Sequence, residues 1–223
     1  MPAKTRSRST RKKTTGGPPR ERRRKARQRV ISSALRLAER GSFRELTIDE
    51  IARSADVSRP AFYTHFSDKE ELLLAAVGEV SEELYAMADR WWHGVGPPAE
   101  RVRRAIEGVV FVYAREARLL AIAAEVSTYD EEVRALWFDI AERFIEATAD
   151  HIRSEQDVGL IPRSLEPRTT AECLYWMAER CCYVHLGTGE KTPKQVVDGL
   201  APVWIAALYP GVIPAGQLSP RRA

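Results

Sequence analysis

The fold of this 223-residue chain is decided by one stretch, Thr47-Ile48-Asp49-Glu50-Ile51-Ala52-Arg53-Ser54-Ala55-Asp56-Val57-Ser58-Arg59-Pro60-Ala61-Phe62-Tyr63-Thr64-His65-Phe66. Thr47 followed three residues later by Glu50 is a capping box, which marks the start of a helix. Ser58 can cap a second short helix, and Pro60 is tolerated in a first turn whose amides have no acceptor inside the helix. The stretch therefore predicts two short helices joined by a turn at residues 56–58.

Each short helix has an apolar face that predicts how it packs. The first helix places four apolar residues on one side: Ile48, Ile51, Ala52 and Ala55. Phe62 and Phe66, four residues apart, anchor the second helix. The opposite, outer side of the second helix consists of Arg59, Ala61, Tyr63, Thr64 and His65. This is the geometry of a helix-turn-helix reading head, whose second helix enters the major groove of DNA.

The same stretch and the residues after it carry a family resemblance. The positions concerned are Val57-Ser58, Phe62-Tyr63, His65-Phe66, Lys69-Glu70 and Leu72. They resemble the signature of the tetracycline-repressor (TetR) family of bacterial transcription regulators. The resemblance implies phosphate contacts from Thr47, Ser58, Tyr63 and Lys69. It also implies that Arg59, Ala61 and Thr64 face base edges, with Arg59 able to pair with guanine.

Pro60-Ala61 departs from that family pattern, because many members carry small polar residues at these two positions. Neither side chain offers a hydroxyl group for a hydrogen bond to a base. Base readout by this part of the helix would therefore depend more on contacts with thymine methyl groups.

Charge is distributed unevenly along the chain. Residues 1–29 contain thirteen Lys or Arg and one Glu, a net charge of +12, and since the whole chain carries +4, residues 30–223 carry −8. A basic arm on an acidic body indicates a polyanion bound at one end, which DNA or an anionic membrane surface would satisfy. Residues 1–21 are predicted to be a disordered arm, which either solubilises the chain or adds phosphate or minor-groove contacts.

The remaining pattern is helical. Residues 22–40 form a supporting helix that ends at Gly41, so residues 22–66 are predicted to be a three-helix DNA-binding domain. Ser67 and Glu70 form another capping pair, which predicts a connecting helix that continues to about His93. Further helices are expected at residues 99–115, 117–127, 130–157, 167–186 and 193–209. Because no stretch alternates apolar and polar residues over the length of a strand, the sequence predicts an all-α fold of about nine helices.

Residues 67–210 are predicted to be a ligand-binding and dimerisation domain, and residues 211–223 a loose tail. Three helical stripes in this domain carry aromatic side chains: Ile106, Val110, Tyr113; Trp137, Phe144, Thr148, Ile152; and Tyr175, Ala178, Glu179, Tyr183. Such stripes are either ordinary core packing or the walls of a small-molecule pocket.

A second resemblance favours the pocket. It rests on Val133-Arg134-Ala135-Leu136-Trp137, Gly159 with Pro162, Met177-Ala178-Glu179-Arg180, and Val203-Trp204 with Leu208-Tyr209. These residues are similar to the ligand domain of the ethionamide-resistance regulators of mycobacteria. The resemblance implies an apolar channel in each subunit, lined by Ile106, Val110, Tyr113, Trp137, Phe144, Thr148, Tyr175, Ala178, Glu179, Tyr183 and Trp204. Asparagines that bind ligands in those regulators are replaced by Tyr175 and Ala178, whereas Glu179 matches.

The last two predicted helices are too apolar for a solvent-exposed end of the molecule. Their apolar residues are Cys173, Leu174, Met177, Cys181, Val184, Val196, Val197, Leu200, Val203, Trp204 and Leu208. In the family this helix pair packs against its two-fold mate, so the resemblance implies a homodimer through the last two helices. Asp at Leu200 or Val203 is then predicted to produce monomers.

Catalytic chemistry has no support in the sequence. The histidines His65, His93, His151 and His185 lack metal-ligand spacing, and no phosphate loop or nucleophile motif is present. Three late cysteines have no paired spacing. We therefore predict no catalytic residue, metal or cofactor. No apolar run approaches the roughly 20 residues that span a bilayer, and the basic amino terminus does not resemble a signal peptide, so we expect a cytoplasmic protein without a membrane partner.

Together these observations predict a homodimeric transcriptional regulator, most simply a repressor. It would bind a pseudo-palindromic operator in double-stranded DNA and be released by a small, mostly apolar effector. The alternative is a non-specific architectural DNA binder, or a binder of anionic surfaces, that acts through its basic arm. Loss of DNA binding on deletion of residues 1–19, with binding retained in Tyr63→Ala, would favour the alternative.

Overall fold

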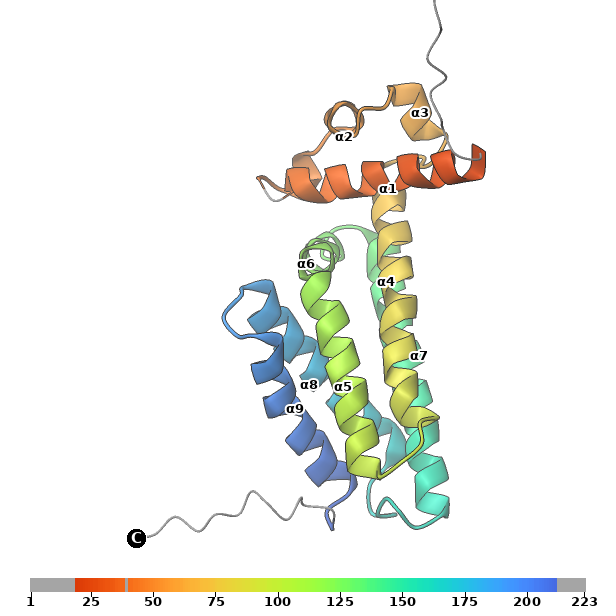
Figure 1. Cartoon of the computed structure of the whole chain (residues 1–223), viewed down its shortest axis with the longest axis vertical. Helices are drawn as coiled ribbons and strands as arrows, with labels where there is room; N and C mark the ends of the chain where they lie inside the picture. The colour runs from red at the N-terminus through yellow and green to blue at the C-terminus, as the bar shows by residue number, and fades with distance from the viewer. Residues whose placement is uncertain (1–18, 39, 212–223) are drawn as a thin grey trace, which may run out of the picture.

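A computed structural model describes residues 19–38 and 40–211 and contains nine α-helices and no strand within those ranges (Figure 1). The head consists of α1 (Pro19–Ala38), a short 3₁₀ helix η1 (Phe43–Glu45), α2 (Ile48–Ser54) and α3 (Arg59–Tyr63). The body consists of α4 (Lys69–Trp92), α5 (Pro98–Arg115), α6 (Ala117–Val126), α7 (Glu131–Asp157), α8 (Pro167–Gly187) and α9 (Pro193–Leu208). The predicted all-α fold with an N-terminal helix-turn-helix unit is confirmed.

The head lies across the top of α4, with α1 between that helix and the pair α2 and α3 (Figure 1). Its core consists of Val30, Phe43, Ile51, Phe62 and Leu72, none of them more than 1% exposed. Helix α1 begins at Pro19, three residues earlier than predicted, because proline is well suited to the first turn of a helix. The other predicted arm residues, 1–18, and tail residues 212–223 lie outside the described ranges.

The caps of the two short helices form as the sequence predicts. Thr47 N donates to Glu50 Oε2 at 2.9 Å, while Thr47 Oγ1 accepts a hydrogen bond from Glu50 N at 3.3 Å. Ser58 Oγ accepts one from Ala61 N at 3.2 Å. The turn between these helices contains Asp56 at φ +53°, in the left-handed region that aspartate tolerates better than most residues.

The start of α4 lies one residue later than the predicted cap. Asp68, rather than Ser67, caps the helix, and its carboxylate accepts from Glu71 N at 2.6 Å. Glu71 in turn accepts from Ser67 N at 2.5 Å, so Glu70 is not part of this cap. Ser67 with Glu70 and Asp68 with Glu71 are both possible capping pairs. The carboxylate of Asp68 at the cap also interacts favourably with the helix dipole.

Helix α4 runs without a break from the head into the body. Its 24 residues correspond to about 36 Å at 1.5 Å per residue. Helix α5 approaches α4 closely at Gly108, where an added Cβ would lie 2.8 Å from Met87 Sδ. Helix α6 also supports the head, because Ser42 Oγ donates to Glu125 Oε1 at 3.0 Å and Arg118 donates to the carbonyl oxygen of Ala38.

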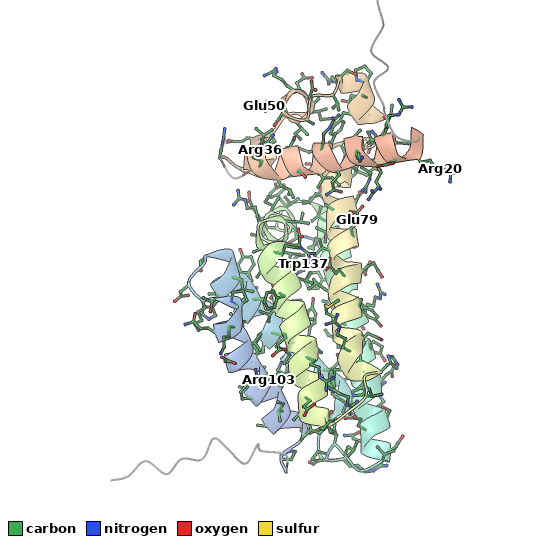
Figure 2. All side chains as sticks on the ribbon, in the orientation of Figure 1. Arg20, Arg36, Glu50, Glu79, Arg103 and Trp137 are labelled. Carbon is green, nitrogen blue, oxygen red and sulfur yellow. The ribbon has the colours of Figure 1, made fainter. Side chains whose placement is uncertain are left out.

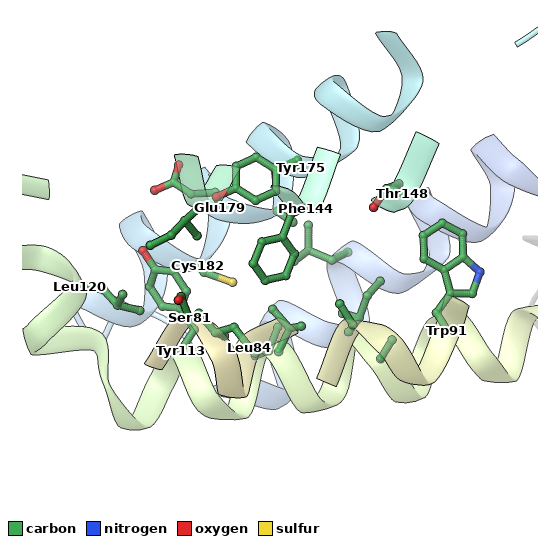
Figure 3. Close-up of a pocket in the computed structure, with 18 of the residues that line it drawn as sticks. Ser81, Leu84, Trp91, Tyr113, Leu120, Phe144, Thr148, Tyr175, Glu179 and Cys182 are labelled. Atoms are coloured by element: carbon green, nitrogen blue, oxygen red, sulfur yellow. The ribbon is translucent and has the colours of Figure 1, made fainter. Parts of the chain in front are cut away.

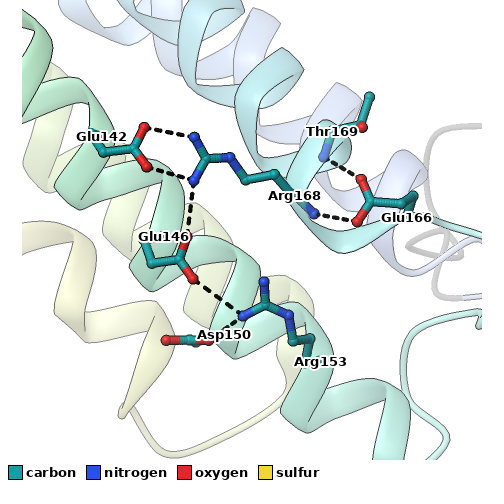
Figure 4. Close-up of polar contacts among 7 residues, drawn as sticks. All are labelled: Glu142, Glu146, Asp150, Arg153, Glu166, Arg168 and Thr169. Atoms are coloured by element: carbon teal, nitrogen blue, oxygen red, sulfur yellow. Dashed lines mark hydrogen bonds and ion pairs between the residues drawn. The ribbon is translucent and has the colours of Figure 1, made fainter.

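Charged side chains hold α8 against α7 (Figure 4). Arg168 donates to both carboxylate oxygens of Glu142 at 2.6 Å and to Glu146 at 2.9 Å. Glu166 caps α8 and accepts from Thr169 N at 2.7 Å. Bidentate arginine pairs of this kind constrain orientation, so the network adds to the apolar packing between α7 and α8. Among the described helices none is both long and apolar enough to cross a membrane.

Candidate functional site

The first candidate site is the outer surface of α3 together with the adjoining end of α1. Arg59, Pro60, Tyr63 and Thr64 are exposed, and Ala61 is half-buried on the same short helix. Figure 2 shows Arg20 at the outer end of α1, on the side of the head where Figure 1 places α3. The structure thus leaves the predicted base-contacting residues accessible, beside a helix end that is rich in arginine.

Arg59 is held by two neighbours on this surface. Its Nη1 lies 3.3 Å from Asp49 Oδ2 in α2, and its Nη2 lies 3.4 Å from Tyr63 Oη. The guanidinium also lies over the Tyr63 ring, 5.8 Å from the centroid. The hydrogen bond that Arg59 donates to Tyr63, and then the charge of Asp49, raise the pKa of Arg59. The side chain therefore stays charged and directed along the outer face of the head.

Basic residues of α1 reach the far end of α3. Arg23 Nη2 donates to the carbonyl oxygen of Thr64 at 3.0 Å, and the guanidinium of Arg27 lies 5.2 Å from the centroid of the Phe66 ring. Burial, followed by the charges of Arg23 and Arg27, lowers the pKa of His65. His65 is half-buried, and this shift favours its uncharged form, in which the ring can still form a hydrogen bond.

Lys69 lies differently from the expectation of a phosphate contact. Its Nζ donates to the carbonyl oxygens of Phe43, Arg44 and Leu46, at 2.9, 2.6 and 3.0 Å, and its side chain is only 15% exposed. These three bonds use all three N–H groups of the ammonium. Lys69 thereby ties the first turn of α4 to η1, which is a positioning role inside the head. Thr47 and Ser58, the other expected phosphate contacts, are exposed.

The second candidate site is a cavity of about 120 Å³ lined by helices of the body (Figure 3). On the same measure, about 10–15 Å³ is enough to hold one water molecule. The cavity therefore has room for an organic molecule. Helices α4, α5, α7, α8 and α9 all contribute to its walls, so a bound molecule would contact the helix that carries the head.

The cavity brings together all but one of the residues predicted to line a channel. These are Ile106, Val110, Tyr113, Trp137, Phe144, Thr148, Tyr175, Ala178, Glu179 and Trp204. Tyr183 is the exception. One turn after Glu179, the neighbouring residue Cys182 lines the cavity in its place. The prediction missed the whole α4 wall: Val77, Ser81, Leu84, Ala88, Trp91 and Trp92. Their three- and four-residue spacing was a usable signal, but it fits a connecting helix equally well.

One end of the cavity is polar although its surroundings are apolar. Figure 3 shows Glu179, Tyr113, Tyr175 and Phe144 grouped at this end. Glu179 Oε2 and Tyr113 Oη are buried without a hydrogen-bond partner in the described part of the chain. Burial raises the pKa of Glu179, and the charge of Arg180 opposes that shift. Burial, followed by the charge of Glu179, also raises the pKa of Tyr113 and of Tyr175.

The opposite end of the cavity is closed by Trp91 and Trp204, whose ring centroids lie 5.6 Å apart. Behind them lies a buried polar network. Trp91 Nε1 donates to Tyr209 Oη at 3.0 Å, and Tyr209 and Arg101 both donate to the carboxylate of Glu155. These hydrogen bonds pair the Glu155 carboxylate, although Trp204 Nε1 and Arg101 Nε stay buried without a partner among the described residues. The carboxylate at the other end, Glu179, accepts no hydrogen bond from those residues at Oε2.

A third surface is formed by the outer sides of α8 and α9. Its exposed apolar or small residues are Cys173, Val184, Gly199, Pro202, Val203 and Ala206. Several residues predicted for a subunit interface are instead buried within the subunit: Leu174, Val196, Val197, Leu200 and Leu208. Leu200 in particular lines the cavity, so the prediction that Leu200→Asp would act on a dimer is corrected, while Val203, at 49% exposure, remains on the outer face.

Two family models match successive parts of the chain. The model described as bacterial regulatory proteins, tetR family, matches residues 30–76, which include α2, α3 and the start of α4. The model described as the C-terminal domain of the transcriptional regulator EthR matches residues 102–210, which include most of the cavity wall. The two matches follow the division into head and body.

Similar whole proteins are also transcriptional regulators. The HTH-type transcriptional regulator EthR of Mycolicibacterium smegmatis is 27% identical over 190 residues, covering 84% of this chain and 87% of that protein. The HTH-type transcriptional regulator BetI of Rhizobium meliloti is 31% identical, covering 66% of this chain and 68% of that one. A transcriptional regulator from Saccharomonospora viridis, solved in complex with choline, shares the fold with a TM-score of 0.66 at 21% identity, covering 82% of this chain and 96% of that one.

Proposed function

Because the chain belongs to the TetR family of bacterial transcription regulators, we propose that it is a dimeric, ligand-responsive repressor with a pseudo-palindromic operator. In this proposal α3 reads the operator, and the cavity of the body holds a small, mostly apolar effector. The observation that carries the proposal is that α4 belongs to both sites: it begins under the head at Lys69 and forms one wall of the cavity from Val77 to Trp92.

The exposed faces support the DNA-binding part of the proposal. In the proposed complex Arg59, Ala61 and Thr64 would meet base edges, while Thr47, Ser58 and Tyr63, all of them exposed, would meet phosphates. The outer sides of α8 and α9 would pack against a second copy of the chain. Such a dimer would bring two α3 helices about 34–36 Å apart, one turn of DNA.

Effector control follows from the shared helix. A molecule that fills the cavity would press α4 away from α7 and α8 and tilt its upper end, so that the two reading helices no longer match one turn of DNA. The effector can shift this equilibrium only by its differential affinity for the two states. Operator DNA must therefore weaken effector binding by the same factor by which the effector weakens DNA binding.

Two measurements test the proposal. Selection of bound sequences from random duplex DNA should yield a two-fold consensus. Effector affinity, measured by calorimetry for a compound found in a thermal-shift screen, should fall when that operator is present. A selection without any consensus would favour non-specific binding through the basic residues 1–29. Equal effector affinity with and without operator would remove allosteric control from the proposal.

A further inference from the structure

We propose that the effector carries a cationic amine, and that this amine binds at the α8 end of the cavity between the carboxylate of Glu179 and the rings of Tyr113, Phe144 and Tyr175. The inference rests on the proposed function in that it names the chemical class of the effector. It goes beyond that function because an apolar cavity alone would accept an alcohol, an ester or a fatty acid equally well.

The first step of the argument concerns the state of Glu179. Its side chain is 8% exposed, and Oε2 is buried without a hydrogen-bond partner among the described residues. Arg180 Nε lies 3.8 Å from Oε2, too far for a hydrogen bond, and the Arg180 side chain is 65% exposed with its guanidinium over the Tyr183 ring. Arg180 therefore makes a long, solvent-exposed ion pair with Glu179 but donates no hydrogen bond to Oε2. A buried carboxylate oxygen that accepts no hydrogen bond is costly, and a bound ligand with donors would reduce that cost.

The second step concerns the groups around that carboxylate. Figure 3 shows the rings of Tyr113, Phe144 and Tyr175 on the sides of the same end of the cavity as Glu179. The centroids of Phe144 and Tyr175 lie 5.8 Å apart, so the two rings form one wall. Aromatic faces carry negative potential and attract cations. Tyr113 Oη, buried without a partner, can accept a further hydrogen bond from an ammonium group.

The third step excludes a ligand with an anionic head group. Among the described residues that line the cavity there is no Lys, Arg or His, and Glu179 is the only charged side chain. A carboxylate head group would find no partner there and would meet the negative charge of Glu179. A neutral alcohol could satisfy Oε2 but would leave the charge uncompensated. The site therefore favours an ammonium head, with the apolar part of the ligand extending toward Trp91.

The experiment uses three probes with one apolar part and different head groups: 4-phenylbutylamine, 4-phenylbutan-1-ol and 4-phenylbutanoic acid. Their dissociation constants are measured by calorimetry on the full chain at neutral pH. A hydrogen bond to a charged group contributes roughly 1.5–3 kcal/mol, so we expect the amine to bind about 10- to 100-fold more tightly than the alcohol. The acid should bind more weakly than both.

Two isosteric variants of α8 complete the design. Glu179→Gln should bring the amine and the alcohol to within about twofold of each other by removing the charge-assisted bond, while alcohol binding shows that the cavity is intact. Glu172→Gln, an exposed position on the same helix, should leave the preference for the amine unchanged. The inference is overturned if the acid binds as tightly as the amine, if no probe binds, or if Glu179→Gln keeps the amine preference. Because every titration is done without DNA, the result is independent of whether an operator exists.

Discussion

Tyr209, the residue that follows α9, donates its phenolic hydrogen to the carboxylate of Glu155 in α7. The same hydroxyl accepts a hydrogen bond from Trp91 Nε1 at 3.0 Å, so three helices meet at one oxygen. Burial would raise the pKa of Glu155, but His151, whose Nε2 lies 3.5 Å from Oε1, and the hydrogen bonds from Tyr209 and Arg101 outweigh that effect and lower the pKa to about 2. The carboxylate is therefore ionised and stabilising in the folded protein.

This pairing predicts how stability depends on acid. Because the pKa of Glu155 is depressed from its ordinary value of 4.5, its contribution is present above about pH 4.5 and is lost as the pH falls toward 2. Tyr209→Phe should lower the free energy of unfolding at pH 7 by about 1–3 kcal/mol and make the loss on acidification smaller. Urea denaturation at several pH values measures both. Tyr129→Phe, at a 39% exposed position, is the control, and equal stability of the two variants would contradict the prediction.

The buried carboxylate of Glu179 should behave in the opposite way. Burial raises its pKa, so the charged form destabilises the folded chain once the pH exceeds the pKa of the unfolded state. We expect Glu179→Gln to increase the free energy of unfolding at pH 7 in the absence of ligand, and the increase to vanish below about pH 4, where both states are neutral. Glu172→Gln should show neither effect. Destabilisation at pH 7 by Glu179→Gln would show that the carboxylate has a partner in the folded protein.

The positions of Val203 and Leu200 separate dimer formation from folding. Val203→Asp places a charge on the exposed side of α9 and should give a folded monomer in sedimentation. Leu200→Asp places a charge in the cavity wall and should instead lower the melting temperature or prevent folding. Val95→Asp, at an 85% exposed position before α5, is the matched control. A Val203→Asp chain that remains dimeric would place the interface elsewhere.

Arg59 should determine which operator is chosen. Arg59→Ala is expected to relax discrimination at one operator position, worth about 1–3 kcal/mol, while binding to random DNA falls much less. Competition binding with single-base operator variants measures this effect. Arg134→Ala, on the exposed start of α7, should change neither quantity. An equal loss on operator and random DNA would mean that Arg59 only contacts phosphate.

Lys69 should affect DNA binding through the shape of the head. Lys69→Met keeps most of the side-chain stem but removes the three bonds to the carbonyl oxygens of Phe43, Arg44 and Leu46. We expect a lower melting temperature and weaker binding to all DNA sequences alike, with the salt dependence of binding unchanged. A decrease of about one in the salt slope would show that the ammonium leaves these carbonyls to bind a phosphate, as the family resemblance implies.

The head was predictable from sequence because its structure depends on local chemistry. Thr47 and Ser58 are caps whose partners lie three residues away, and the turn at Asp56 follows from the space between the two helices. The start of α4 was misplaced by one residue because Ser67 and Asp68 each have a suitable glutamate three residues later. Local rules could not choose between them, whereas the folded chain uses Asp68.

The cavity was only partly predictable because helical periodicity shows which side of a helix is inside, not what that side meets. Most of the predicted lining was recovered from aromatic stripes, yet Leu200 was assigned to a dimer surface although it lines the cavity. The α4 wall was missed because the three- and four-residue spacing of its apolar residues is also what a connecting helix requires. Lys69 shows the same limit, since its three acceptors lie 23 to 26 residues away in sequence.

The close approach of Gly108 in α5 to Met87 in α4 marks a point about which α4 can pivot. An added Cβ at Gly108 would lie 2.8 Å from Met87 Sδ, so the absence of a side chain there lets α4 and α5 pack closely at this point. Lys69 lies 18 residues before Met87 along α4, which corresponds to a lever arm of about 27 Å at 1.5 Å per residue. A rotation of about 5° would carry the head end of α4 through roughly 2.4 Å by that geometry. Under the proposed function, a small expansion of the cavity between Val77 and Leu84 would in this way become a larger displacement of the head.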